Sequence, residues 1–228
     1  MNVAKIEAME DRVKGRSYRS PVRAEQAAST RRRILAAAQR LFVAHGYAAT
    51  TVAAIAAEAG VSLDTIYASV GRKPQLILGA VDVVLGESPD APTAEQRGYV
   101  IAIRQAPTAE EKIALYAEAL GRLLPQVEPL QEALRYASMS DPECNLAWRQ
   151  LADRRAANMR LFAADLRATG QLRPDLSDAQ VADIVWATNS SELFGLFRQR
   201  GWSPQEYSAF LRDLWQRELL DAGEAPSS

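Results

Sequence analysis

The sequence predicts an all-α protein, and three observations lead to this prediction. Apolar residues recur with the spacing of an α-helix near both ends of the chain, from Ile34 to Phe42 and from Tyr207 to Trp215. Residues that cap helix N-termini precede such runs, and glycines follow several of them. Hydrophobic residues make up 48% of the 228 positions and charged residues 24%, which is typical of a globular protein.

The composition argues against a membrane protein and against a secreted one. No run approaches the roughly 18 to 20 apolar residues that a membrane-spanning helix needs, and residues 1–15 lack the apolar segment of a secretory signal. Cys144 is the sole cysteine, so it cannot form an internal disulfide, and we expect a reducing cytoplasm. We expect this thiol to be a buried small hydrophobic group in preference to a redox sensor.

Residues 1–28 are expected to form a basic, flexible arm. After a weakly amphipathic start, glycine, proline and serine alternate with arginines. Such a segment buries too little apolar surface to offset the entropy lost on ordering. Its arginines either contact a phosphate backbone or a minor groove, or belong to a solvated leader without function. The three arginines concerned are Arg16, Arg19 and Arg23.

The first strong helix is predicted from Ser29 or Thr30 to about His45. Gly46 follows it and suits the left-handed conformation that ends many helices. His45 is the sole histidine, and no cysteine or group of carboxylates is spaced to share a metal with it, so no metal site is expected. A catalytic Ser–His–acid arrangement would have to use this structurally committed position, so no catalytic residues are predicted.

Two short helices joined by a tight turn are predicted between Thr50 and Lys73. Thr50 and Thr51 offer hydroxyls to the free N–H groups of the first helix. Gly60 permits the sharp turn, and Ser62 caps the second helix. A helix-turn-helix of this kind, here over residues 51–70, places its second helix in the major groove of DNA. The outward face of that helix carries Leu63, Asp64, Thr65, Tyr67 and Ser69.

The distribution of charge agrees with a nucleic-acid-binding N-terminal part. Residues 1–76 hold twelve Lys and Arg against six Asp and Glu, whereas residues 77–228 hold 15 basic and 22 acidic residues. A basic end attached to an acidic body indicates that only the first part meets a polyanion. An ordinary solvated surface is the alternative interpretation of the same asymmetry.

The run from Arg33 to Leu76 resembles the DNA-binding domain of the tetracycline-repressor (TetR) family of bacterial regulators. The resemblance rests on RILAAAQRLFVAHGY, TTVAAIAAEAGVSLDTIY and GRKPQL, and it extends without a gap. It implies an all-helical homodimer with an N-terminal three-helix helix-turn-helix domain, residues 29–88, followed by a helical-bundle ligand-binding and dimerisation domain, residues 89–228. Regulators of this family usually repress transcription until a small molecule binds.

By this resemblance, Thr51 binds a phosphate through its hydroxyl and backbone N–H, while Tyr67 and Lys73 add further contacts to the DNA backbone. The first turn of the recognition helix faces base edges. Leu63 and Asp64 there provide few long hydrogen-bond donors, so specificity is expected to rest partly on DNA shape. The candidates for DNA binding are Arg33, Thr51, Ser62, Leu63, Asp64, Thr65, Tyr67, Ser69 and Lys73.

Residues 89–228 are predicted to be helical almost throughout. The segment ESPDAPTAEQ interrupts the helical pattern and marks the domain boundary. Apolar faces then recur in residues 109–124 and 127–139, and Asp141 followed by Pro142 begins a long helix that reaches Thr169. This half contains no phosphate-binding loop and no nucleophile motif, so no cofactor is expected.

The last two helices, at about 178–199 and 204–220, are predicted to form the dimer interface. Ser177 caps the first, which ends at Gly201, and Ser203 precedes the second. In the TetR family such a pair usually packs against its symmetry mates as a four-helix bundle. The composition alone equally permits an intramolecular hairpin.

A small-molecule pocket is expected between the helices of this body. Arg155 stands out, because a guanidinium among apolar residues suits an acidic ligand, although a salt bridge at the rim is the simpler explanation. For the aromatic residues and methionines, a core position is the simpler explanation. The candidate lining residues are Tyr116, Met139, Trp148, Arg155, Met159, Phe162, Trp186 and Asn189.

These observations together predict a cytoplasmic, homodimeric regulator that binds double-stranded DNA at an inverted repeat and is released by an unidentified small molecule. Repression is the favoured direction of control. Two alternatives are an enzyme built on the helical body and a protein-interaction module carrying a helix-turn-helix. The missing catalytic constellation counts against the enzyme, and a large apolar surface groove in place of an enclosed cavity would favour the interaction module.

Overall fold

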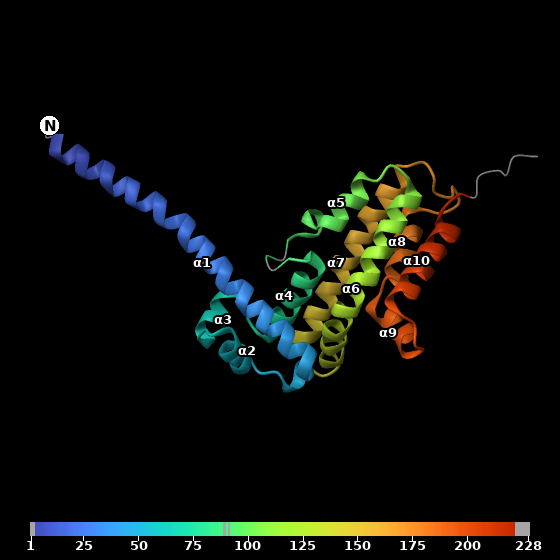
Figure 1. Ribbon diagram of the computed structural model, residues 1–228, viewed down its shortest axis with the longest axis horizontal. Helices are drawn as coiled ribbons and strands as arrows, with labels where there is room; N and C mark the ends of the chain where they lie inside the picture. Colours follow the sequence, from blue (N-terminus) through green and yellow to red (C-terminus); the bar gives the residue numbers. More distant parts are fainter. Residues whose placement is uncertain (1–2, 89, 91, 222–228) are drawn as a thin grey trace, which may run out of the picture.

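The computed structural model describes residues 3–88, 90 and 92–221, with side chains described from residue 22 onward. Within these ranges the regular structure is helical apart from one isolated bridge, which confirms the predicted all-α class (Figure 1). No helix in this described part is long and apolar enough to cross a membrane. The elements are α1 (Val3–Ala49), α2 (Val52–Ala59), α3 (Leu63–Ser69), α4 (Lys73–Gly86), the 3-10 helix η1 (Ala94–Gln96), α5 (Gly98–Gln105), α6 (Ala109–Ser138), α7 (Pro142–Arg167), α8 (Asp178–Thr188), α9 (Ser191–Gln199) and α10 (Pro204–Leu219).

Helix α1 begins far earlier than the sequence predicts. The expected start at Ser29 or Thr30 is wrong, because the helix already runs from Val3 and its first half projects from the body (Figure 1). The backbone of residues 3–28 is therefore helical, and the flexibility expected for this arm stays a prediction. Residues 24–28, with sequence AEQAA, are strong helix formers that carry the helix upstream of the predicted cap.

An ion pair supports this upstream extension of α1. Arg32 Nη2 lies 2.5 Å from Glu25 Oε1, two turns back along the same helix. Arg23 is exposed on the projecting part. The DNA contacts considered for Arg16 and Arg19 involve side chains that lie outside the described residues.

At the end of α1, the hydroxyl of Thr50 donates hydrogen bonds to backbone carbonyls, in addition to the positive φ of Gly46. Gly46 has the positive φ of 72° that was predicted for it, and α1 kinks at this glycine before its last residues up to Ala49. The Thr50 hydroxyl then lies 2.8 Å from the Gly46 carbonyl and 3.1 Å from the Leu41 carbonyl, and Thr50 itself is buried. The expectation that Thr50 caps the next helix is therefore wrong: it satisfies carbonyls at the end of α1, and Thr51 alone caps α2.

The first four helices share one core with the C-terminal half of α6 and the N-terminal half of α7. Ile34, Ile55, Ile66 and Ile77, one from each of α1 to α4, are completely buried in it. Cys144 is buried there too, as expected for a small hydrophobic group. The long helices α6 and α7 add Val127, Leu130, Leu134, Ala147 and Leu151 to the same core. Residues on both sides of the predicted 88/89 boundary thus pack together, and the division into domains stays a prediction.

A second core lies at the other end of α6 and α7, where α5, α8, α9 and α10 surround them. Helix α6 is continuous over 30 residues even though it contains Pro125 and Pro129. A proline in a helix interior removes a backbone hydrogen bond and disfavours the helix by about 3 kcal/mol. Buried residues before, between and after the two prolines hold the helix in place, and they include Leu123, Leu124, Val127 and Leu130.

The predicted single helix over residues 178–199 is wrong, because the chain breaks it in the middle. Asn189, with φ −86° and ψ 12°, ends α8, and Ser190 is extended and caps α9 by accepting the Leu193 N–H. Asparagine and serine side chains favour such breaks because they offer the backbone local hydrogen bonds that compete with the helix.

Helix α10 stabilises the break between α8 and α9. The Tyr207 hydroxyl donates to the Thr188 carbonyl at 2.7 Å. Trp215 Nε1 donates to the Thr188 hydroxyl at 2.8 Å. Residues at the end of α8 therefore find their partners on α10 instead of in a continued helix.

The apolar face of α10 is divided between two environments. Ser203 caps the helix as predicted, with Glu206 completing a capping box. Tyr207 and Trp215 then point into the monomer core, whereas Phe210 and Leu214 are only partly buried. Part of the face predicted for dimerisation thus serves the intramolecular core.

Candidate nucleic-acid interface and ligand cavity

Side-chain caps fix the geometry of the helix-turn-helix. The Thr51 hydroxyl accepts the Ala54 N–H at 3.0 Å at the start of α2, and the Ser62 hydroxyl accepts the Thr65 N–H at 3.2 Å at the start of α3. Between them, Gly60 takes a left-handed φ of 64°, which glycine adopts without strain. The two caps expected within residues 51–70, Thr51 and Ser62, are therefore both present.

Helix α3 turns one face into the core and the other outward. Ile66 is completely buried, while Leu63, Asp64 and Tyr67 are exposed, Tyr67 by 52%. Thr65 is half-buried, and its hydroxyl lies 2.8 Å from that of Ser62, so the two hydroxyls share a hydrogen bond. The outward face can thus present an apolar group, a carboxylate and a phenol to a partner.

Basic residues of α1 flank this face. Arg33 is exposed, and its neighbour Arg31 donates from Nη1 to the Ser69 carbonyl at the end of α3 at 2.6 Å. Arg40 pairs with Glu58 of α2 at 2.8 Å. Sequence reasoning included Arg33 and Ser69 and missed Arg31, whose partner is distant in sequence and leaves no local pattern.

Lys73, the predicted phosphate contact at the start of α4, is already engaged within the protein. Its ammonium lies 4.2 Å from the centroid of the Tyr47 ring. Burial lowers the pKa of Lys73, and the nearby Asp141 carboxylate opposes that decrease. A lysine held over an aromatic ring is attracted by it and has fewer positions to sample before it meets a phosphate.

A shallow groove joins this lysine to the first turn of α7. Arg72 Nη1 donates to Glu143 Oε1 at 2.5 Å, and Asp141 caps α7 by accepting the N–H groups of Glu143 and Cys144. The groove therefore connects two predicted DNA contacts to the body. It is lined by Tyr47, Val52, Tyr67, Arg72, Lys73, Pro74, Asp141 and Glu143.

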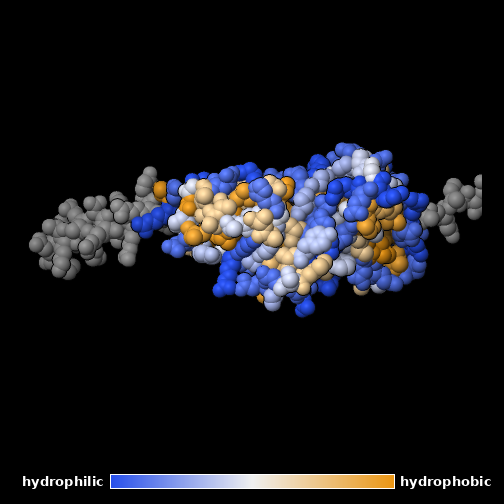
Figure 2. Space-filling view, turned by 90° about the horizontal axis from the view of Figure 1, so that it is seen from below, coloured by the Kyte–Doolittle hydropathy of each residue, from blue (hydrophilic) through white to orange (hydrophobic). Residues whose placement is uncertain are grey.

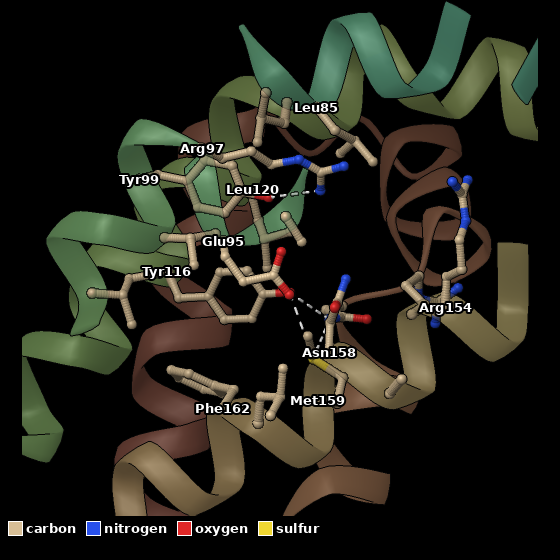
Figure 3. A pocket seen from close by; sticks show the side chains of 18 of the residues that line it. Leu85, Glu95, Arg97, Tyr99, Tyr116, Leu120, Arg154, Asn158, Met159 and Phe162 are labelled. Carbon is tan, nitrogen blue, oxygen red and sulfur yellow. Dashed lines mark hydrogen bonds between the residues drawn. The ribbon is translucent and has the colours of Figure 1, made fainter. Parts of the chain in front are cut away.

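A cavity of about 490 Å³ lies in the helical body, between α4, α5, α6 and α7 (Figure 3). This volume falls within the range of about 300 to 1,000 Å³ that small-molecule sites commonly have. Among the predicted ligand contacts, the residues that line the cavity are Tyr116, Arg155, Met159, Phe162 and Asn189.

Three other predicted contacts lie elsewhere. Met139 is exposed at the end of α6, and Trp148 packs against the N-terminal core. Trp186 is on the surface of α8, with the Arg155 guanidinium 5.0 Å from its ring centroid. Their helical spacing was correct, but spacing alone could not distinguish this cavity from the surface or from the second core.

The inner end of the cavity is polar. Asn189 Nδ2 donates to the Tyr116 hydroxyl at 2.8 Å and lies 2.9 Å from Met159 Sδ. Figure 3 shows Tyr116 and Arg97 reaching into the space from one side, opposite Asn158 and Met159. Burial raises the pKa of the Tyr116 phenol, so this group is a neutral hydroxyl at physiological pH.

Hydrogen bonding in this cavity is incomplete. In the part of the chain that the structure describes, three buried side-chain atoms have no hydrogen-bond partner: Arg97 Nε, Arg155 Nε and Asn189 Oδ1. All three residues line the cavity. Because unpaired buried polar groups are unfavourable and uncommon, their concentration here indicates a site that a ligand or ordered water completes.

Arg155 does not make the rim salt bridge that its sequence position suggested. Its Nη2 donates to the Trp186 carbonyl at 2.6 Å, and no carboxylate lies within 4.0 Å of it among the described residues. Burial lowers the pKa of Arg155, with Glu192 opposing that decrease. Arg97 was missed by sequence reasoning because it follows the predicted linker, outside any helical pattern.

The described residues contain no group of three or more His, Cys, Asp or Glu arranged to hold a metal ion. His45 is exposed near the end of α1 and is not part of any such group. The polar groups of the cavity are suited to binding through hydrogen bonds and charge.

The helix-turn-helix segment matches a known family. Residues 34–78 match the family model described as bacterial regulatory proteins, tetR family. A search of curated protein sequences gives no match.

Solved structures of bacterial regulators share the fold. NalD, the secondary repressor of the MexAB-OprM multidrug efflux pump in Pseudomonas aeruginosa, is 19% identical with a TM-score of 0.61, over 86% of this chain and 99% of that one. FadR from Bacillus subtilis, in complex with stearoyl-CoA, is 20% identical with a TM-score of 0.62, over 80% and 95% of the two chains. FadR from Bacillus halodurans, a fatty acid degradation regulator, is 18% identical with a TM-score of 0.62, over 81% and 93%. At these identities the likeness concerns the fold.

Proposed function

We propose, from the premise that residues 34–78 form a TetR-family DNA-binding domain, that this protein is a homodimeric repressor released from an inverted-repeat operator by a small molecule. The observation that carries the proposal is the exposed outward face of α3. Ser62 caps this helix, and Ile66 anchors it in the core of a domain that matches this family. A bacterial regulator of this kind works in the cytoplasm. The family and the similar structures are transcriptional regulators and not enzymes.

The contacts with DNA divide into two kinds. Thr51 accepts the Ala54 N–H but keeps its own hydroxyl hydrogen for a phosphate oxygen, and Tyr67 is free to do the same. Lys73 adds charge from the groove. Leu63 and Asp64 at the start of α3 face the bases, where Leu63 suits thymine methyls and Asp64 accepts from cytosine.

The dimer seam is proposed on the outer side of the C-terminal helices, residues 178–199 and 204–220. Leu196 of α9 and Trp202 after it are exposed, and Phe197 and Phe210 beside them are only partly buried. Figure 2 shows hydrophobic side chains gathered at this end of the molecule. A contiguous exposed apolar patch of this kind is typical of a protein interface. A second copy related by twofold symmetry would cover it and set the two recognition helices about 34 Å apart, or somewhat more in this family.

Helix α7 connects the cavity with the DNA-binding helices. Its first turn holds Arg72 through Glu143, and Arg155, about three turns later, lines the cavity. A ligand that shifts α7 therefore moves α4 and changes the spacing of the recognition helices. DNA affinity falls by the difference between the ligand's affinities for the two shapes.

Two substitutions in α3 test the division of contacts. Tyr67→Phe should weaken binding about tenfold on every DNA sequence, because it removes one hydrogen bond to a charged phosphate. Thr65→Ala should also change the preferred sequence, because Thr65 and its partner Ser62 lie beside the base-reading turn. Selection of bound sequences from random DNA, followed by anisotropy titrations, measures both effects.

Tyr136→Phe is the matched control, since Tyr136 is an exposed tyrosine on α6 outside the predicted interface. It should leave affinity and preference unchanged. Equal losses on all DNA sequences for Tyr67→Phe and Thr65→Ala would show that the two residues do not have different roles.

A further inference from the structure

The cavity in the helical body carries more positive than negative charge. Its lining includes four arginines, Arg97, Arg104, Arg154 and Arg155, and three acids, Asp82, Glu95 and Asp165. The acids are largely committed to other partners. Asp82 lies 3.0 Å from Arg154 and 3.7 Å from Arg97, and Asp165 lies 3.7 Å from Arg104.

The remaining acid, Glu95, is exposed at η1, where hydrogen bonds from its own backbone N–H and from Thr93 lower its pKa, as do the charges of Arg104 and Arg97. It forms no salt bridge within 4.0 Å among the described residues and is the most solvated of the three acids. This leaves Arg155 without a close carboxylate, and leaves Arg97 sharing Asp82 with a second guanidinium.

Both of these arginines have a buried Nε atom, but only Arg97 is buried as a whole residue, and Arg155 is half-buried. Arg97 is only 8% exposed, and its Nε is one of the unpartnered buried atoms. Arg155 is held at one nitrogen by the Trp186 carbonyl, while its buried Nε has no partner. An unpaired buried donor on a charged group is strongly unfavourable, so the site calls for an acceptor that neutralises charge.

The two arginines line the same cavity as Tyr116 and Asn189. The Tyr116 hydroxyl accepts a hydrogen bond from Asn189 Nδ2 at 2.8 Å at the polar end of this cavity. The direction of the pKa shift agrees with this arrangement, because burial raises the pKa of the Tyr116 phenol while Asn189, Arg155 and Arg97 oppose that increase. Asn189, only 4% exposed, closes this end.

The rest of the lining is apolar. Leu120, Leu123, Leu124 and Val127 come from α6, and Leu151 and Phe162 come from α7. A ligand that fills this cavity must therefore bury an apolar body against α6 and α7. One cavity presents a long apolar wall and a cationic end.

We propose that this cavity binds a monocarboxylic acid with an apolar body, whose carboxylate accepts hydrogen bonds from Arg155 and Arg97. The proposal rests on the proposed function, in which the cavity holds the controlling ligand. Guanidinium and carboxylate match in geometry, and the pair would neutralise charge and give the unpartnered Nε atoms an acceptor.

The same contact gives the acid a route to the dimer seam. Arg155 now joins α7 to the last turn of α8 through the Trp186 carbonyl. A carboxylate that competes for this guanidinium weakens that link, and α8 belongs to the proposed seam. Arg155 is in this respect a positioning residue as well as a ligand contact.

The test is calorimetric titration of the full chain, without DNA, with saturated carboxylates from hexanoate to dodecanoate. The amide, alcohol and amine of the same chain length as the carboxylate that binds most tightly serve as probes with the same skeleton. We expect one carboxylate of the series to bind at least about tenfold more tightly than its amide, alcohol or amine. No binding by any carboxylate, or equal or tighter binding of the amide or amine, would overturn the proposal.

Substitutions of the two arginines test whether they bind the carboxylate. Arg155→Gln and Arg97→Gln should each weaken carboxylate binding about tenfold to 100-fold and leave amide binding unchanged. Arg160→Gln, at an exposed arginine of α7 that does not line the cavity, is the matched control. Circular dichroism confirms folding of each variant. An unchanged carboxylate affinity in both cavity variants would show that neither arginine binds the carboxylate.

A second titration on the DNA complex separates the two proposals. If a carboxylate binds in the cavity but leaves DNA affinity unchanged, the ligand class stands and control by this ligand fails. If an amine or a neutral compound alone releases DNA, control by a ligand stands and the acid is excluded.

Discussion

A Leu196→Arg variant is expected to elute as a monomer in size-exclusion chromatography and to lose about 100-fold or more in operator affinity. Leu196 is 59% exposed on α9, where a twofold-related copy would bury it beside the Phe197, Trp202 and Phe210 rings. A guanidinium there would be desolvated without a partner and would face its own symmetry mate. Two linked recognition helices bind with an effective concentration that a monomer lacks, so DNA binding falls with dimerisation.

Leu146→Arg provides the matched control. Leu146 has the same exposed fraction, 59%, but lies on α7 outside the proposed seam. It should leave both the elution volume and the DNA affinity unchanged. A Leu196→Arg protein that remains dimeric and binds its operator normally would place the interface on another surface.

A Trp215→Ala variant is expected to lose about 3–5 kcal/mol of unfolding free energy. Trp215 is the largest fully buried side chain, and its ring stacks on Tyr116 with centroids 5.6 Å apart. Removing it leaves a cavity in the C-terminal core and deprives the Thr188 hydroxyl of its donor. Urea unfolding at a fixed protein concentration measures the change.

Trp215→Phe separates packing from hydrogen bonding. It keeps an aromatic ring in the core but removes the indole N–H, so the loss should fall to about 1–2 kcal/mol. A loss below about 1 kcal/mol for Trp215→Ala would contradict the expected contribution of this fully buried ring to the C-terminal core.

The helix-turn-helix could be predicted nearly residue by residue because its determinants are local. Thr51 and Ser62 cap the helices that follow them, and Gly60 takes the left-handed conformation between them. Asp141 likewise begins α7 as expected. Capping and turn formation depend on neighbours within a few residues, which is information that a sequence contains directly.

Features that depend on distant partners could not be predicted. The break between α8 and α9 has a local signal in Asn189 and Ser190, but the contacts from Tyr207 and Trp215 of α10 that stabilise it cannot be read from the neighbouring sequence. The role of Thr50 depends on carbonyls at the end of α1. Apolar periodicity continues through the break, so the pattern indicated one helix where there are two.

The cavity could be predicted only in part for the same reason. Tyr116, Met159 and Phe162 face inward with helical spacing, and the sequence placed them among the candidates. Arg97 reaches the cavity from the segment before α5, and no periodicity marks it. The unpaired charge of Arg155 becomes visible only once its neighbours are known.

Footprinting of the full chain on the DNA upstream of its own gene tests the central claim most directly. The account predicts one protected inverted repeat whose half-site centres lie about one helical turn or somewhat more apart, with affinity that falls as salt rises. It also predicts that a compound shown to bind the cavity removes the protection. No protected repeat, protection insensitive to salt, or protection that persists when the cavity is saturated would contradict it.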